Sequence, residues 1–180
     1  TFHQGMRGAH LAQNALAVLL AVRALGCDIA VASRALADVR STAGRGARQT
    51  LRLNDDEILL LDESYNANPA SMAAALAGLA ATSTGNRRIA AMGDMLELGA
   101  EAVAYHTGLS DATARADRVS CCGPNMQHLF NALPQEKRGA WTLTSAELAP
   151  QVAAALEPGD VVMVKGSLGS KMGPLVKALE

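Results

Sequence analysis

The first forty residues carry apolar side chains at the spacing of an amphipathic helix. Leucine and valine recur at intervals of three, four or seven between Leu11 and Leu25, and Gly26 provides a stop. This pattern predicts a helix over residues 11–25, followed by a shorter one over 29–36. No strand precedes these helices for them to cover, and the chain begins at Thr1 rather than Met. We therefore expect the sequence to be a fragment of a longer protein.

From residue 44 onward the pattern changes to short apolar runs that alternate with segments of helical periodicity. Strands separated by helix-length segments indicate right-handed βαβ units. The first two strands are joined through Asn54, Asp55 and Asp56 and should form an antiparallel hairpin. For residues 47–180 we predict an α/β fold with a Rossmann-like, doubly wound, mostly parallel sheet. The expected strands are 49–53, 58–62, 88–92, 118–122, 141–143 and 161–165, and the expected helices are 70–81, 100–115, 126–133, 146–156 and 174–179.

Polar residues gather in the loops that follow the predicted strands. In an open α/β sheet, ligands bind at the carboxyl ends of the strands. We therefore expect Asp62, Asp94 and Lys165 to face one crevice, which would suit an anionic or zwitterionic ligand. The alternative for the first loop is that Asp62, Asn66 and Asn68 only form a turn, as Asp and Asn commonly do.

Composition excludes several classes of function. The chain has 16 Lys and Arg against 17 Asp and Glu, and 3% aromatic residues, so we expect no nucleic-acid partner. Apolar runs fall short of about 18 residues, so no membrane segment is expected. The three cysteines form no zinc-binding spacing and are expected to be reduced, which is typical of a cytoplasmic protein. No signal peptide is visible.

Four motifs resemble the Mur ligase family in order and spacing. DESYNANPASMAAAL, GDMLELG and VKGSLGSKM are similar to its C-terminal domain, and GAHLAQNALAVLLAVRALG to the helix that closes its central ATP-binding domain. The resemblance assigns residues 1–43 to that central domain and 44–180 to the C-terminal domain. The YNANP and GDM-x-ELG elements resemble the branch that uses ATP and Mg²⁺ to join D-Ala-D-Ala to a UDP-muramoyl-tripeptide in the cytoplasm. A monomer is expected.

The resemblance also implies roles for single residues at a nucleotide site. Arg45, in the GRG linker, would reach the γ-phosphate as a catalytic residue, and Asn14 would contact the adenine. Either Asp62 or Glu63 would bind the ribose hydroxyls. The remaining residues expected to shape the nucleotide edge are Tyr65, Asn66 and Asn68.

A second group of residues is implied for the dipeptide. Lys165 and Ser167 are candidates for its carboxylate, and Asp94 and Glu97 for its ammonium group, although helix capping is an equal alternative for Asp94. The family's KGSR reads KGSL here, so either Lys171 compensates for the missing guanidinium or that group is not essential.

The chain lacks the phosphate-binding sequence GxxxxGK[ST]. ATP and Mg²⁺ should therefore be held mainly by a central domain outside this sequence, no metal ligand is expected within it, and the chain alone should be inactive. Two other functions stay open: a non-catalytic Rossmann-like nucleotide-binding module, and another amide ligase of the superfamily, such as the folate polyglutamate or cyanophycin type.

Overall fold

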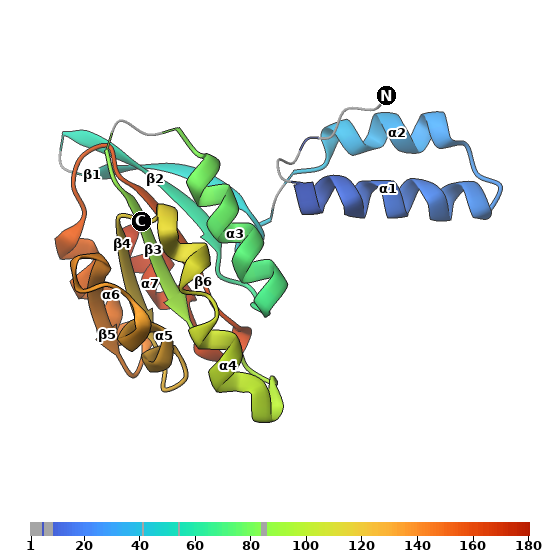
Figure 1. Cartoon of the computed structure of the whole chain (residues 1–180). Coiled ribbons are helices and arrows are strands. Elements are labelled where there is room, and N and C mark those ends of the chain that lie inside the picture. The colour runs from blue at the N-terminus through green and yellow to red at the C-terminus, as the bar shows by residue number, and fades with distance from the viewer. Residues whose placement is uncertain (1–4, 6–8, 41, 54, 84–85) are drawn as a thin grey trace. The chain divides into compact units, whose positions relative to one another are not determined.

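The computed structural model describes residues 5, 9–40, 42–53, 55–83 and 86–180, and the chain divides into two compact units, residues 1–42 and 43–180. The first unit contains helices α1 (Ala9–Ala24) and α2 (Ile29–Asp38), which pack against each other (Figure 1). Both helices were predicted from the apolar spacing. Asp28 caps α2, because its Oδ1 accepts the N–H of Ala30 at 2.7 Å.

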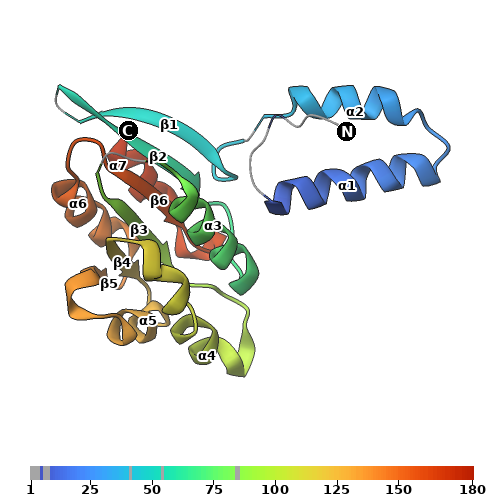
Figure 2. The ribbon, with the colours of Figure 1, turned by 45° about the horizontal axis from the view of Figure 1, so that its top comes forward.

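The second unit is built on one six-stranded sheet with the order β1-β2-β6-β3-β4-β5. All neighbouring strands are parallel except the pair β1–β2, which is antiparallel, so the predicted fold class and hairpin are confirmed. Figure 2 shows β1 at the edge of this sheet, beside β2. In the linker of the hairpin, Asn54 lies outside the described residues. The strands are β1 (Ala47–Leu53), β2 (Asp56–Glu63), β3 (Arg88–Gly93), β4 (Arg118–Cys122), β5 (Arg138–Thr142) and β6 (Val161–Lys165).

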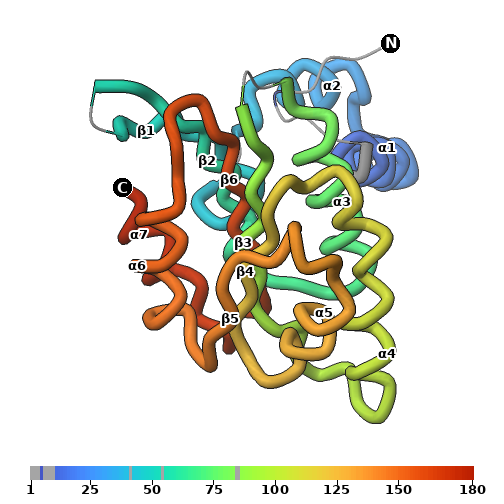
Figure 3. Tube along the Cα trace, turned by 60° about the vertical axis from the view of Figure 1, so that its left-hand side comes forward, coloured from blue at the N-terminus to red at the C-terminus, as the bar shows by residue number. Residues whose placement is uncertain are grey.

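Helices cover both faces of the sheet (Figure 3). One face carries α3 (Pro69–Ala81), α4 (Ala102–Thr107) and α5 (Met126–Ala132). The other carries α6 (Ser145–Ala155) and α7 (Gly173–Leu179). Side chains alternate between faces along each strand. On β2, Leu61 therefore packs into the first apolar core and Leu60 into the second, so the sheet separates two cores.

The helix predicted over residues 100–115 is broken in the structure. A 3₁₀ turn, Gly99–Glu101, leads into the short α4, and a second 3₁₀ segment covers Asp111–Arg115. Within that second segment the Thr113 hydroxyl donates to the carbonyl of Ser110 at 2.6 Å. Ser, Thr and Asp side chains compete for backbone groups in this way and favour interruptions of a helix.

The fifth strand lies earlier than predicted, at Arg138–Thr142 rather than 141–143. Gly139 explains the error, because glycine usually argues against a strand interior. Here a side chain at that position has no room: an added Cβ would lie 2.2 Å from the hydroxyl of Ser120 on β4. Glycine lets the two strands approach at this point.

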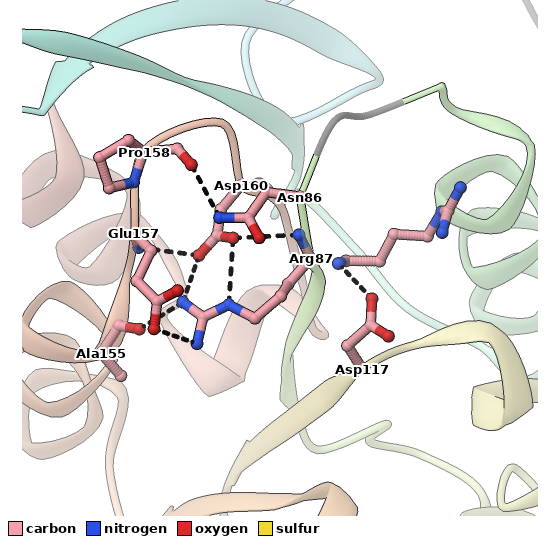
Figure 4. A network of polar contacts seen from close by, with 8 residues as sticks. Asn86, Arg87, Asp117, Ala155, Glu157, Pro158 and Asp160 are labelled. Atoms are coloured by element: carbon pink, nitrogen blue, oxygen red, sulfur yellow. Dashed lines mark hydrogen bonds and ion pairs between the residues drawn. The ribbon is translucent and has the colours of Figure 1, made fainter.

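An ion-pair network lies at the amino ends of the central strands, which is the end of the sheet opposite the predicted site (Figure 4). Arg87 donates to both carboxylate oxygens of Asp160, at 3.2 and 2.7 Å, and pairs with Glu157 at 2.7 Å. The hydrogen bond to Asp160 and its charge raise the pKa of Arg87 above its usual value. Next to it, Asp117 accepts the N–H of Arg88 at 2.7 Å. These bonds join the segments that enter β3, β4 and β6.

Candidate functional site

Asp62, at the end of β2, fastens the Gly44–Gly46 segment to the sheet. Its Oδ2 accepts the N–H of Gly44 at 2.6 Å, and its Oδ1 accepts the N–H of Ser64 at 3.1 Å. Backbone hydrogen bonds complete the attachment, from Gly46 N to Asp62 O at 2.8 Å and from Tyr65 N to Gly44 O at 3.0 Å. The segment and the end of β2 therefore form one fixed structure.

Gly44 is required for this close approach. Its φ of +75° lies in the left-handed region, which favours glycine, and an added Cβ would lie 3.0 Å from the Cβ and N of Tyr65. Gly44 was not predicted as a site residue, although the GRG pattern was a signal for it.

Arg45 stacks on the ring of Tyr65. Its guanidinium carbon lies 3.8 Å from the ring centroid, within the range of a cation–π interaction. Both side chains are exposed, so packing in a core does not enforce the contact. The structure thus brings together two residues that were predicted to belong to the nucleotide site.

An open pocket of about 450 Å³ lies beside this stack, between the Gly44–Gly46 segment and α7. Its lining includes Asp62, Ser64 and Tyr65 from the end of β2 and the loop after it, and the basic residues Lys171 and Lys177. Lys177 was not predicted as a site residue, and Lys171 only as a possible substitute for a missing arginine. The other lining residues are Ala43, Gly44, Gln49, Leu168, Met172, Gly173, Val176 and Glu180.

Lys165, at the end of β6, is buried away from this pocket. Its Nζ donates to the carbonyl of Asn66 at 2.9 Å and lies 3.9 Å from a carboxylate oxygen of Glu63. Burial lowers the pKa of Lys165, and the negative charge of Glu63 partly offsets this effect. Its side chain ties β6 to the loop after β2.

Ser167 is also buried and joins three loops. Its hydroxyl accepts the N–H of Leu96 at 2.9 Å and donates to the carbonyl of Ala67 at 3.2 Å. Its own N–H donates to the carbonyl of Asp94 at 3.0 Å. The hydroxyl is thus engaged within the protein in both directions.

The carboxylate of Asp94 caps a helix, but not the one that follows it in the chain. Oδ1 accepts the N–H of Met126 at 2.7 Å, and Oδ2 accepts from the N–H and side-chain amide of Asn125, at 3.2 and 3.1 Å. These groups lie at the start of α5, where backbone N–H groups otherwise lack partners. The capping alternative therefore describes the side chain of Asp94 in this structure.

His106 supports the same loop from α4. The ring is fully buried, with Nδ1 2.6 Å from the carbonyl of Ala102, while Nε2 accepts the N–H of Met95 at 2.9 Å. This pattern requires the proton on Nδ1 of a neutral ring, because Nε2 must offer a lone pair. The residue fixes the loop that carries Asp94.

The predicted residues do lie at the same end of the sheet, at the carboxyl ends of the strands. The prediction that their side chains face one common crevice is wrong. Asp62 pairs in register with Val164, and Glu63 with Lys165. Because paired residues share a face and neighbours alternate, Asp62 lies on the face of α7, whereas Lys165 and Glu63 lie on the face of α3. Asp62 lines the pocket, and neither Lys165 nor Asp94 does.

The remaining predicted residues occupy three kinds of position. Asn68 caps α3 by accepting the N–H of Ser71 at 2.8 Å, and the side chain of Asn66 accepts the N–H of Ala67, so both serve the turn. Glu97 is exposed at the tip of its loop with φ +63°. Asn14 is exposed on α1, in the other unit.

Within the described residues, no group of three or more His, Cys, Asp or Glu side chains is placed to hold a metal ion. Among the same residues, no helix is both long and apolar enough to cross a membrane. Of the three thiols, Cys27 is exposed, and burial raises the pKa of Cys122 to about 12.

Comparison with known proteins places this arrangement in a family. The family model described as Mur ligase, glutamate ligase domain, matches residues 47–168. The chain belongs to the Mur ligase family. The matched Mur ligase segment runs from β1 to the turn after β6, and thus contains Asp62, Tyr65 and the loop that carries Asp94.

Similar proteins extend the likeness beyond that segment. The UDP-N-acetylmuramoyl-tripeptide–D-alanyl-D-alanine ligase of Rickettsia prowazekii is 30% identical over 93% of this Mur ligase chain, and that of Escherichia coli is 33% identical over 96%. A crystal structure of MurF from Acinetobacter baumannii superposes with a TM-score of 0.82 at 26% identity over 99% of the chain. The chain covers only 36%, 37% and 39% of these proteins, respectively.

Proposed function

We propose that this chain is part of an ATP-dependent ligase that joins D-Ala-D-Ala to a UDP-N-acetylmuramoyl-tripeptide. The observation that carries the proposal is the match of nearly the whole chain to relatives of that name, across both the α1 motif and the YNANP and GDM-x-ELG elements. We also propose that residues 1–43 belong to the central ATP-binding domain and 44–180 to the C-terminal domain. The reaction would take place in the cytoplasm.

The proposed chemistry forms an amide at the expense of ATP. The terminal carboxylate of the tripeptide takes up a phosphoryl group and leaves ADP. The amino group of D-Ala-D-Ala then attacks the acyl phosphate carbonyl, loses a proton and displaces phosphate. This chain's contribution is to bind and orient the reactants, because a correctly aimed amine removes much of the entropic barrier.

We propose Asp62, rather than Glu63, as the carboxylate for the ribose hydroxyls. A carboxylate has about four acceptor positions, and the bonds to Gly44 and Ser64 use one on each oxygen of Asp62. Asp62 also lines the pocket, whereas Glu63 lies on the opposite face beside Lys165. Arg45 is proposed to meet the γ-phosphate, and Asn14 the adenine. Mg²⁺ is assigned to the part of the enzyme outside this chain.

For the dipeptide, the geometry favours Lys171 over Lys165 as the partner of the carboxylate. Lys171 is exposed and lines the pocket, while the ammonium group of Lys165 is already engaged by Asn66. Glu97, exposed at its loop tip, is proposed for the ammonium end. Asp94, Lys165 and Ser167 are proposed to hold the loops in place.

The test uses the full-length protein that contains this chain. Phosphate release should require ATP, Mg²⁺, the UDP-muramoyl-tripeptide and D-Ala-D-Ala together, and the chain alone should release none. In the full-length protein, Lys171→Gln should raise the KM for the dipeptide about tenfold, by loss of one charge-assisted contact. Arg52→Gln, an exposed change on β1, is the matched control and should leave the KM unchanged.

Other outcomes separate the alternatives. Release with a single amino acid as acceptor, but not with D-Ala-D-Ala, would indicate another amide ligase of the superfamily. Nucleotide binding without release from any acceptor would indicate a binding module. Activity of the chain alone would contradict the assignment of ATP and Mg²⁺ to a missing domain.

A further inference from the structure

We infer that Tyr65 is a positioning residue that holds the guanidinium of Arg45 beside the pocket. The inference rests on the proposed role of Arg45 toward phosphate. Its starting point is the 3.8 Å separation between the guanidinium carbon and the Tyr65 ring centroid. A cation over the face of an aromatic ring is attracted by the ring quadrupole, and at an exposed site this attraction gives preference to one arrangement of a long side chain.

The backbone that carries the two side chains of this contact is held by hydrogen bonds. The stack therefore has a defined geometry at its base. Tyr65 N donates to Gly44 O at 3.0 Å, and the carboxylate of Asp62 holds Gly44 N at 2.6 Å. The residue that carries the guanidinium is thus attached, through its neighbour, to the residue that carries the ring. The two side chains, rather than the backbone, are left to be ordered by the stack.

The Tyr65 ring that contacts Arg45 also belongs to a residue that lines the pocket. Tyr65 lines the pocket together with Asp62 and Lys171, although the residue is 44% exposed. An exposed aromatic ring contributes little to the stability of the apolar cores. Because Tyr65 both lines the pocket and contacts the guanidinium of Arg45, we assign it a role in arranging charge for an anionic ligand. Holding the guanidinium there before the ligand arrives reduces the ordering cost during the reaction.

The first experiment tests the stack in the chain itself by NMR. Protons of the Arg45 side chain that lie over the ring should be shifted upfield in the wild type and in Tyr65→Phe, which keeps the ring. The shift should disappear in Tyr65→Leu. An unshifted Arg45 in the wild type would overturn the inference. The circular dichroism spectrum of each variant shows whether the fold is kept.

The second experiment measures turnover in the full-length protein. Tyr65→Leu should lower kcat about two- to fivefold, the change that an exposed cation–π contact supplies, with the KM for the dipeptide unchanged. Tyr65→Phe should restore kcat. In an Arg45→Gln background, Tyr65→Leu should have no further effect. An equal loss in that background would overturn the inference, because Tyr65 would then act independently of Arg45.

The two experiments also separate this inference from the proposed function. If the full-length protein shows no ligase activity, the proposed function fails, and with it the role of Arg45 toward phosphate. The NMR result then still decides whether Tyr65 holds Arg45. If ligase activity is present but Tyr65→Leu equals the wild type, only the positioning role fails.

Discussion

Lys165 carries a buried ammonium group whose effect on stability depends on pH. Burial lowers its pKa from the usual 10.5. Below the lowered pKa, both the folded and the unfolded chain bind the proton, and the folded state bears the full cost of burying it. As the pH rises from the folded pKa toward 10.5, the folded chain loses the proton first. The unfolded chain then binds more protons, so stability increases with pH.

Urea unfolding at a series of pH values would check this. The free energy of unfolding of the wild type should rise relative to that of Lys165→Met as the pH approaches 10.5. The two proteins share every other titrating side chain, so the difference isolates Lys165. A difference that stays constant or falls over this range would contradict the burial of a lysine with a lowered pKa.

The same residue shows why the site could be predicted only in part. The apolar runs that end in Asp62 and Lys165 indicate two strands with polar ends at one edge of the sheet, which is correct. The face that each side chain occupies depends on strand register, and Asp62 lies beside Val164 rather than Lys165. A shift of one residue moves a side chain to the other face, and sequence periodicity alone does not give the register between two strands.

At the scale of elements, Asp160 should contribute more to the free energy of unfolding than any other single side chain that joins strands. Its carboxylate is fully buried and accepts from Arg87 N, Nε and Nη2 and from Glu157 N. Asp160→Ala should lower the free energy of unfolding by about 2–4 kcal/mol, because Arg87 loses the partner of its charge and several N–H groups lose their acceptor. Denaturant unfolding measures this loss.

Glu157 provides the matched control for this prediction. It also pairs with Arg87, at 2.7 Å, but its side chain is 57% exposed. Exposed ion pairs contribute little, so Glu157→Ala should cost less than about 1 kcal/mol. Equal losses for the two variants would mean that the network acts through total charge rather than through the buried acceptor.

Elements were predicted well where one physical signal dominates. The five residues of β6 are all buried and form a nearly continuous apolar run, typical of a central parallel strand. By contrast, β5 contains Gly139, where a side chain would have no room beside Ser120 on the neighbouring strand. Asp94 likewise caps a helix that starts 32 residues later. Such long-range contacts leave no periodic signal in the sequence.

At the scale of the molecule, the two units differ in how much apolar surface they bury. Both apolar cores are built entirely from residues of the second unit, as far as the described residues show. In the helical unit Ala15 is buried, while Leu16, Leu20 and Leu25 are 50%, 65% and 79% exposed. Exposed apolar faces of this kind mark surfaces that interact with another protein segment. This agrees with the proposal that the helices belong to a larger domain.

Residues 43–180 should therefore fold without the first 42. The shortened chain should unfold cooperatively at the same temperature as the second unit of the full chain, since it keeps both cores. It should also bind less of a dye that reports exposed apolar surface. Replacing Leu16, Leu20 and Leu25 with Gln in the full chain is the matched control, and should lower dye binding without moving that transition. Calorimetry and dye fluorescence measure the two effects. If the shortened chain lost its cooperative transition, the second unit would depend on the helices for its stability, and the division at residue 43 would not describe the way this protein folds.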